Sequence, residues 1–118
     1  MRLNPKLQNG AYVFVEFPHD DDAPNDAICI FREQESTTAI VPESVALARG
    51  WSYGFRAAWI ILGAETSLDD LGITAAFSRV LSDNGISCNV FAPIRHDHIF
   101  VPYDMGALAV KLLEDLEL

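Results

Sequence analysis

Residues 71–87 read LGITAAFSRVLSDNGIS and contain the strongest structural signal of the chain. The apolar side chains of this segment recur at spacings of three and four residues and therefore fall along one stripe of a helix: Ile73, Ala76, Phe77, Val80 and Leu81. Gly85 stands where a left-handed residue commonly ends a helix. The segment therefore predicts an amphipathic helix over 73–84 with one buried face.

The segments on either side of this helix are typical of strands. Residues 56–63 (RAAWIILG) form a nearly continuous apolar run, which is typical of an interior strand buried on both faces. Residues 88–94 and His98–Pro102 predict two strands joined by a tight turn, and Asp104 is a favourable N-cap for a last helix. The apolar stripe expected for that helix comprises Met105, Leu108, Ala109, Leu112 and Leu116. The resulting order, β-α-β-β-α, is one strand short of a ferredoxin-like βαββαβ sandwich.

The first half of the chain supplies further strands and a short helix. Residues 11–17 (AYVFVEF) predict a strand, and residues 27–32 and 37–41 predict a hairpin. Pro42 and Gly50 suit the beginning and the end of a helix over Glu43–Arg49. Because an apolar sheet edge left open invites aggregation, we expect strand 11–17 to complete the C-terminal sheet, in the same chain or in a second copy.

The charge and the apolar runs of the chain exclude two classes of partner. The 118 residues carry 8 Lys and Arg against 17 Asp and Glu, a formal net charge of −9. Both halves are acidic, so no basic surface is expected for nucleic acid. The longest strictly apolar stretch, 57–62, is far shorter than the ~20 residues of a membrane span. Residues 1–10 lack the apolar core of a secretory signal, and two isolated cysteines, Cys29 and Cys88, are typical of buried thiols; we therefore expect a cytoplasmic protein.

The glycine-led helix of residues 71–87, with its Gly-Ile step at 85–86, resembles the signature of ACT domains. Residues 3–17, 31–33 and 96–102 (HDHIFVP) also resemble small bacterial proteins of unassigned function that pair an ACT-like half with an ACT domain. The resemblance covers nearly the whole chain. It implies an α+β fold with two ACT-like halves, 1–55 and 56–118, of ferredoxin-like type, with mostly antiparallel sheets and helices on one face.

The resemblance also implies a ligand site, because ACT domains usually bind small ligands, often amino acids, between paired domains. The matching positions lie in the loop before the helix and on the facing strand: Ser67, Leu68, Asp69, Asp70, Leu71, Gly72, Ile73, Thr74, Asn89 and Val90. Backbone N–H groups at a helix start favour a carboxylate, and Asp69 or Asp70 could pair with an amino group. The alternative is that Asp70 simply caps the helix and Gly72 only forms the turn. Leu71 replaces the proline found in many ACT domains, so the identity of the ligand does not transfer.

Other polar groups give weaker signals. His96 and His98 would share one face of a strand with Asp97 opposite, but no third metal ligand is evident. Residues 20–22 with Asp26 lack the spacing of a calcium loop and favour a solvated acidic segment. The nucleophile-elbow, phosphate-loop, dinucleotide and zinc-protease motifs are absent from the sequence. We therefore expect no metal, no cofactor and no catalytic residue.

These observations predict a non-enzymatic regulatory module that binds a small molecule, with an amino acid as the favoured ligand and a homodimer as the favoured assembly. One alternative is a structural or protein-interaction module without a ligand. A second alternative is a small enzyme that uses His96 and His98 with an acidic partner.

Overall fold

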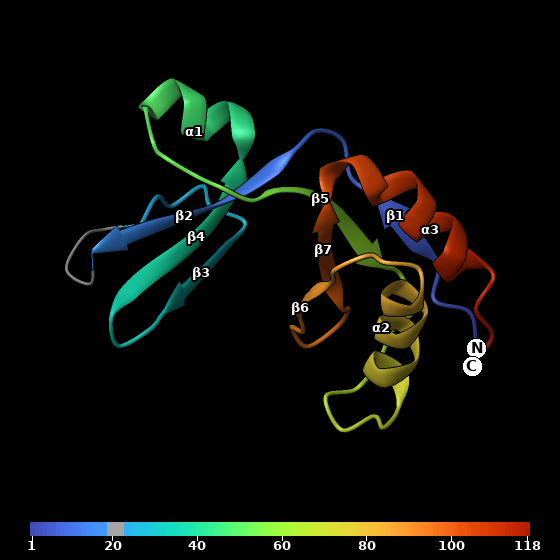
Figure 1. Ribbon diagram of the computed structural model, residues 1–118. Helices are drawn as coiled ribbons and strands as arrows, with labels where there is room; N and C mark the ends of the chain where they lie inside the picture. The colour runs from blue at the N-terminus through green and yellow to red at the C-terminus, as the bar shows by residue number, and fades with distance from the viewer. Residues whose placement is uncertain (19–22) are drawn as a thin grey trace. The chain divides into compact units, whose positions relative to one another are not determined.

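A computed structural model describes residues 1–18 and 23–118 (Figure 1). The chain divides into two compact units. The larger unit contains Met1–Asn9 and Ala58–Leu118, and the smaller unit contains Gly10–Ala57. Each unit is a sheet with its helix or helices packed on it, and each is described separately.

The sheet of the larger unit has the strand order β1-β5-β7-β6. The strands are β1 (Pro5–Leu7), β5 (Arg56–Leu62), β6 (Asn89–Phe91) and β7 (His98–Pro102). Of β5, only the residues from Ala58 onward belong to this unit. The helices are α2 (Ile73–Asp83), a 3-10 turn η1 (Tyr103–Met105) and α3 (Gly106–Glu114). The predicted order β-α-β-β-α from residue 56 is thus present.

The strand that completes this sheet is β1. Pro5, Lys6 and Leu7 pair in antiparallel register with Leu62, Ile61 and Ile60 of β5. Sequence analysis gave this place to residues 11–17; these form most of β2 (Tyr12–Pro18) in the smaller unit, and β2 pairs with β5 at Arg56 and Ala57 only. The difference arises because β1 is three residues long and contains a proline and a lysine, so it carries no strand pattern.

The ends of the chain hold β1 in place. The Met1 amino group donates to the Leu118 carbonyl oxygen at 2.6 Å, and the Leu118 N–H donates to the Met1 carbonyl oxygen at 2.9 Å (Figure 1). Arg2 and Glu117 form an antiparallel bridge and an ion pair of 2.8 Å. Next to them Leu3 is buried in the core. The two termini therefore lie side by side within the larger unit.

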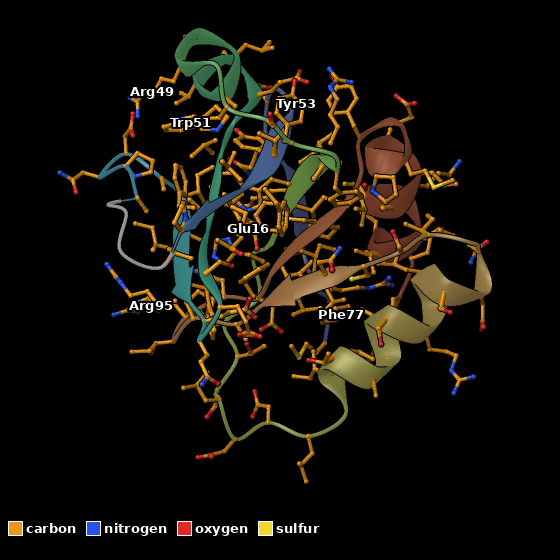
Figure 2. All side chains as sticks on the ribbon, turned by 60° about the vertical axis from the view of Figure 1, so that its left-hand side comes forward. Glu16, Arg49, Trp51, Tyr53, Phe77 and Arg95 are labelled. Atoms are coloured by element: carbon orange, nitrogen blue, oxygen red, sulfur yellow. The ribbon has the colours of Figure 1, made fainter. Side chains whose placement is uncertain are left out.

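The core of the larger unit lies between the sheet and the two longer helices, α2 and α3, which lie next to each other (Figure 1). Phe77 and Leu81 are the fully buried side chains of α2, and Figure 2 shows Phe77 on the side of the helix that faces the strands. The stripe predicted for α2 is thus confirmed. In α3 the buried positions are Gly106, Ala109 and Leu113, whereas Leu108, expected in the stripe, is 47% exposed.

The helix ends differ in how well the sequence predicted them. Gly85 has a φ of +74°, and the N–H groups of Gly85 and Ile86 donate to the carbonyls of Ser82 and Leu81. This is the Schellman arrangement that a left-handed glycine allows. Asp104, in contrast, does not cap α3: it lies inside the 3-10 turn, and α3 begins after Met105 without a side-chain cap. Because of this turn the helix begins one residue later than predicted, which the sequence pattern does not reveal.

The smaller unit is built on the same principle. Its strands are β2, β3 (Cys29–Arg32) and β4 (Ser36–Pro42), in the order β3-β4-β2, and all pairs are antiparallel. Alternate residues Val13, Val15 and Phe17 of β2 face a core closed by α1 (Glu43–Arg49) through its buried Ala46. Arg49 pairs with Asp26 at 3.0 Å and lies over the Trp51 ring at 5.1 Å (Figure 2).

Strand β5 contributes residues to both units. Arg56 and Ala57 pair with Val13 and Tyr12 of β2 and close the sheet of the smaller unit. From Ala58 onward the same strand belongs to the larger unit. The predicted α+β class with mostly antiparallel sheets is confirmed. No helix in the described parts of the chain is long and apolar enough to cross a membrane.

Candidate functional site

A small pocket of about 90 Å³ opens at the start of α2 in the larger unit. Three segments surround it: the loop after β5, the first turn of α2, and the connection between β6 and β7. Its lining residues are Thr66, Ser67, Leu68, Asp70, Ile73, Thr74, Ala92 and Asp97. The pocket thus lies where an uncapped helix end meets two loops.

The first turn of α2 borders this pocket and has no side-chain cap. Gly72 takes a φ of +85° at the N-cap position, and no side chain caps the helix. The first turn also contains no acidic residue. The earliest intrahelical bond runs from the Ala76 N–H to the Gly72 carbonyl at 3.0 Å, so the N–H groups of Ile73 and Thr74 are among those that a helix leaves open. Such a helix end favours a negatively charged group.

Asp70 organises the loop rather than the helix. Its Oδ2 accepts a hydrogen bond of 2.7 Å from the Ser67 N–H, and its own N–H donates to the Ser67 carbonyl at 3.1 Å. The alternative in which Asp70 caps the helix is therefore wrong. A hydrogen bond from the Thr66 N–H to the Arg95 carbonyl, of 3.3 Å, ties the loop to the β6–β7 connection.

Asp97 is the second carboxylate of the pocket. It precedes β7, and its carbonyl oxygen accepts a hydrogen bond of 2.9 Å from the Leu62 N–H. The residue is only 9% exposed. Burial raises the pKa of the Asp97 carboxyl, the nearby positive charge of His98 partly opposes the rise, and the negative charge of Asp70 adds to it. The two carboxylates therefore repel each other across a site that contains no lysine, arginine or histidine.

The structure brings some of the predicted site residues together and separates others. Five line the pocket: Ser67, Leu68, Asp70, Ile73 and Thr74. Asp69, Leu71 and Gly72 belong to the same loop but do not line it, and Leu71 is 94% exposed. Asn89 and Val90 do not line it either; Asn89 is exposed on β6, whereas Val90 packs against the core. Whether any of these residues binds a ligand stays a prediction.

Three lining residues were not predicted as site residues: Thr66, Ala92 and Asp97. A usable signal existed only for Asp97. Strand alternation places Asp97 opposite His98, on the same face as the buried Ile99 and Val101. A carboxylate that leads an apolar row is unusual, because a buried charge is costly unless something pairs with it.

The two histidines have partners outside this pocket. The Trp59 Nε1–H donates to His98 Nδ1 at 3.0 Å, and His96 Nδ1 lies 3.4 Å from the Ala64 carbonyl oxygen. Burial lowers the pKa of His98, and the neighbouring His96 lowers it further. No group of three potential metal ligands occurs among residues 1–18 and 23–118. The acidic residues 20–22 lie outside the described residues.

A larger depression of about 520 Å³ lies between the N-terminal segment and the end of α3. It is lined by Arg2, Asn4, Pro5, Lys6, Gly63 and Glu114. The Arg2 guanidinium is already engaged by Glu117 and by the Glu114 carbonyl at 3.1 Å. These neighbours thus neutralise much of the Arg2 charge. The pocket at α2 is therefore the better candidate for a ligand site.

Comparisons with known proteins support the resemblance noted from the sequence. Two ACT-domain profiles match, one over residues 1–58 and the other over residues 56–115. No curated protein matches the chain.

Three solved structures are similar. A Vibrio cholerae protein of unknown function, described as a possible transport protein, is 32% identical, with 100% of this chain and 92% of that chain covered and a TM-score of 0.88. An Agrobacterium tumefaciens protein is 19% identical over 96% of this chain and 87% of its own, with a TM-score of 0.79. A structure of aspartokinase alpha and beta subunits is 14% identical over 96% of both chains, with a TM-score of 0.66.

The last two likenesses show the fold alone, because their sequence identity is low. The two profile matches meet at residues 56–58, within β5, and together extend over nearly the whole chain. Together with the antiparallel sheets and packed helices described above, they establish that this chain belongs to the ACT-domain family, as a tandem of two ACT domains.

Proposed function

We propose that the protein is a regulatory module that binds an amino acid in the pocket at the start of α2. ACT domains are in general ligand-binding regulatory modules, and both halves of this chain match them. The observation that supports the proposal is the uncapped first turn of α2, whose residues Ile73 and Thr74 line the pocket. An amino-acid carboxylate is the kind of anion that such a helix end favours.

A thermal-shift screen of the twenty amino acids, followed by calorimetry of those that raise the melting temperature, tests this proposal. A ligand that binds only the folded protein stabilises it by mass action, by about 2.7 kcal/mol at a hundredfold excess over Kd. Calorimetry then gives the affinity of the wild-type protein, with which the affinities of the variants below are compared.

A substitution that fills the pocket tests whether the amino acid binds there. Thr74 is exposed and lines the pocket, so Thr74→Trp blocks the site without disturbing the core. Ala75 is exposed one position further along α2 and does not line the pocket, so Ala75→Trp is the matched control. We expect the first variant to lose binding and the second to retain it. If no amino acid binds the wild-type protein, or if both variants bind equally well, the proposal is wrong.

A homodimer is the second part of the proposal. Three large apolar side chains of the two loops that surround the pocket are well exposed: Leu68 at 66%, Leu71 at 94% and Ile94 at 76%. Exposed apolar side chains that gather in one place commonly mark a protein-binding surface. We propose that a second copy covers them.

Light scattering over a range of protein concentrations tests the dimer. Leu71→Asp should shift the protein toward the monomer, whereas Leu108→Asp, a 47% exposed leucine on α3, should not. A dimer whose stability no amino acid changes would instead favour the ligand-free interaction module. A monomeric wild-type protein would exclude the dimer.

A further inference from the structure

The half-buried side chains of Trp59 and His98 connect two neighbouring strands of the larger unit. Trp59 lies on β5 and His98 is the first residue of β7, the strand next to β5 in the sheet. The Trp59 Nε1–H donates to His98 Nδ1 at 3.0 Å, and the two rings stack with their centroids 5.8 Å apart. Phe100 of β7 stacks on the same indole at 6.1 Å. A directed hydrogen bond and ring contacts together therefore hold the indole against β7.

The hydrogen bond from Trp59 determines the protonation state of His98. An indole N–H can only donate, so His98 Nδ1 must be the acceptor and must be without a proton. The neutral tautomer with its proton on Nε2 meets this requirement, whereas an imidazolium has a donor at both ring nitrogens. A proton on Nδ1 would place two N–H groups against each other at 3.0 Å. Protonation of His98 is therefore incompatible with this hydrogen bond.

His96, two residues earlier in the chain, has the opposite requirement. Its Nδ1 lies 3.4 Å from the Ala64 carbonyl oxygen, which can only accept a hydrogen bond. The ring must therefore donate from Nδ1, and both a neutral tautomer and the imidazolium can do so. Protonation preserves the contact of His96 and breaks that of His98, although the two side chains experience the same pH.

The surroundings of His98 favour its neutral form near neutral pH. Burial lowers the pKa of His98, and the neighbouring His96 lowers it further, whereas the negative charge of Asp97 raises it. These two neighbours are the titratable groups that act on His98 within the described ranges 1–18 and 23–118. The adjacent strands face His98 with Trp59 of β5 and with Phe91 of β6, its register partner, and neither side chain titrates.

We infer that the Trp59–His98 pair is a pH-sensitive contact of the sheet, in which a proton on His98 breaks the hydrogen bond and loosens β7 from β5. The pair lies at the beginning of β7, directly after Asp97, whose carbonyl oxygen accepts the Leu62 N–H. The acid-induced change should therefore affect the end of the sheet where β5 ends and β7 begins. The inference does not depend on a ligand and goes beyond the proposed function.

An NMR titration from pH 8 to pH 5 tests the inference, because it follows the His98 ring and the indole N–H of Trp59 in the same sample. The Trp59 signal is identified by its absence from Trp59→Phe, since the chain has one other tryptophan, Trp51. We expect the Trp59 N–H signal to shift with the same midpoint as the His98 ring. Below that midpoint, its exchange with solvent should become faster.

Three variants separate the hydrogen bond from the titration. Trp59→Phe keeps a ring for stacking but removes the donor, so the proton affinity of His98 should rise by roughly two- to twelvefold, the contribution of one neutral hydrogen bond. His98→Asn keeps an acceptor near the position of Nδ1 and does not titrate, so the Trp59 signal should become independent of pH. His96→Asn is the matched control and should retain the shift of the Trp59 signal. Near-ultraviolet circular dichroism shows whether each variant is folded.

Two results would overturn the inference directly: a Trp59 signal that does not follow the His98 titration, and a Trp59→Phe protein with the wild-type proton affinity at His98. A pH response that is lost in His96→Asn but retained in His98→Asn would assign it to His96 and would also overturn the inference. If Trp59→Phe does not fold, the two histidine variants decide the question. None of these results affects the proposed amino-acid binding, which calorimetry measures separately.

Discussion

Gly106, the first residue of α3, leaves no room for a side chain between the helix and β5. A Cβ atom at this position would lie 2.8 Å from the Ala58 Cβ and 3.1 Å from the Leu7 Cδ1. The backbone of Gly106 is helical, with φ −59° and ψ −48°, so an alanine would not strain it. We predict that Gly106→Ala nevertheless destabilises the larger unit, although alanine is the better helix former.

Two opposing terms decide the magnitude. The gain from helix propensity is at most about 1 kcal/mol. Against it stands the contact with Ala58, whose Cβ is fixed to the β5 backbone and cannot rotate away, unlike the Leu7 side chain. Carbon atoms normally approach to ~3.5–4.0 Å, and overpacking of this kind costs ~1–3 kcal/mol. The expected net loss is about 1 kcal/mol, or ~4 °C in melting temperature for a domain of this size.

Urea unfolding followed by circular dichroism measures this loss. Gly54 is the matched control, because a Cβ there meets no atom within 4 Å and Gly54→Ala should not destabilise the protein. The double variant Gly106→Ala/Ala58→Gly removes the clash and should show a favourable coupling energy of about 1 kcal/mol. A Gly106→Ala protein as stable as the wild type, or a double variant without coupling, would refute the reasoning.

Three further predictions concern α2, the histidine pair and a thiol. Phe77→Ala should cost about 3–5 kcal/mol of unfolding free energy, because Phe77 is completely buried in the core; a cost below ~1 kcal/mol would contradict its placement. Burial lowers the pKa of His98 in the folded state, so the contribution of His98 to stability is fully present above the unfolded pKa near ~6.5 and is lost progressively as the pH falls from there through the lower folded pKa. Denaturation at pH 7.5 and 6.0 should show this loss, and His98→Asn should reduce it. Burial raises the pKa of Cys88 to about 11, so iodoacetamide at pH 8 should modify this thiol far more slowly in the folded protein than in urea; equal rates would contradict its burial.

The sequence was most informative where one physical requirement determined the pattern. The stripe of α2 and the glycine that ends it follow from the period of a buried helix, and both are present as predicted. The strand around Trp59 was equally clear, because every residue of β5 after Arg56 is at least partly buried. Short elements have no such pattern in the sequence. The three residues of β1 were therefore not predicted as a strand, and Asp104 was predicted to cap α3 although it lies in the 3-10 turn before the helix.

The candidate site was predictable only in part for a related reason. The loop and the first turn of α2 are adjacent in sequence, so Asp70, Ile73 and Thr74 could be grouped from the sequence alone. The opposite wall depends on how far β6 extends. Because β6 ends at Phe91, the wall consists of Ala92 and Asp97 from the connection that follows it, rather than of Asn89 and Val90. Which residues form this wall is therefore determined by the tertiary structure and not by the local sequence pattern.

The double membership of β5 has a practical consequence for anyone who wishes to study one ACT domain alone. A cut near residue 55 removes Arg56 and Ala57 from β2 and, at the same time, removes β1 from β5. Each fragment would then have a strand, β2 or β5, with an unpaired edge. Such edges pair with other chains, so the fragments would associate or aggregate instead of folding independently. An isolated larger unit therefore requires a rearranged gene, in which residues 1–9 follow residue 118 through a short linker across termini that already touch.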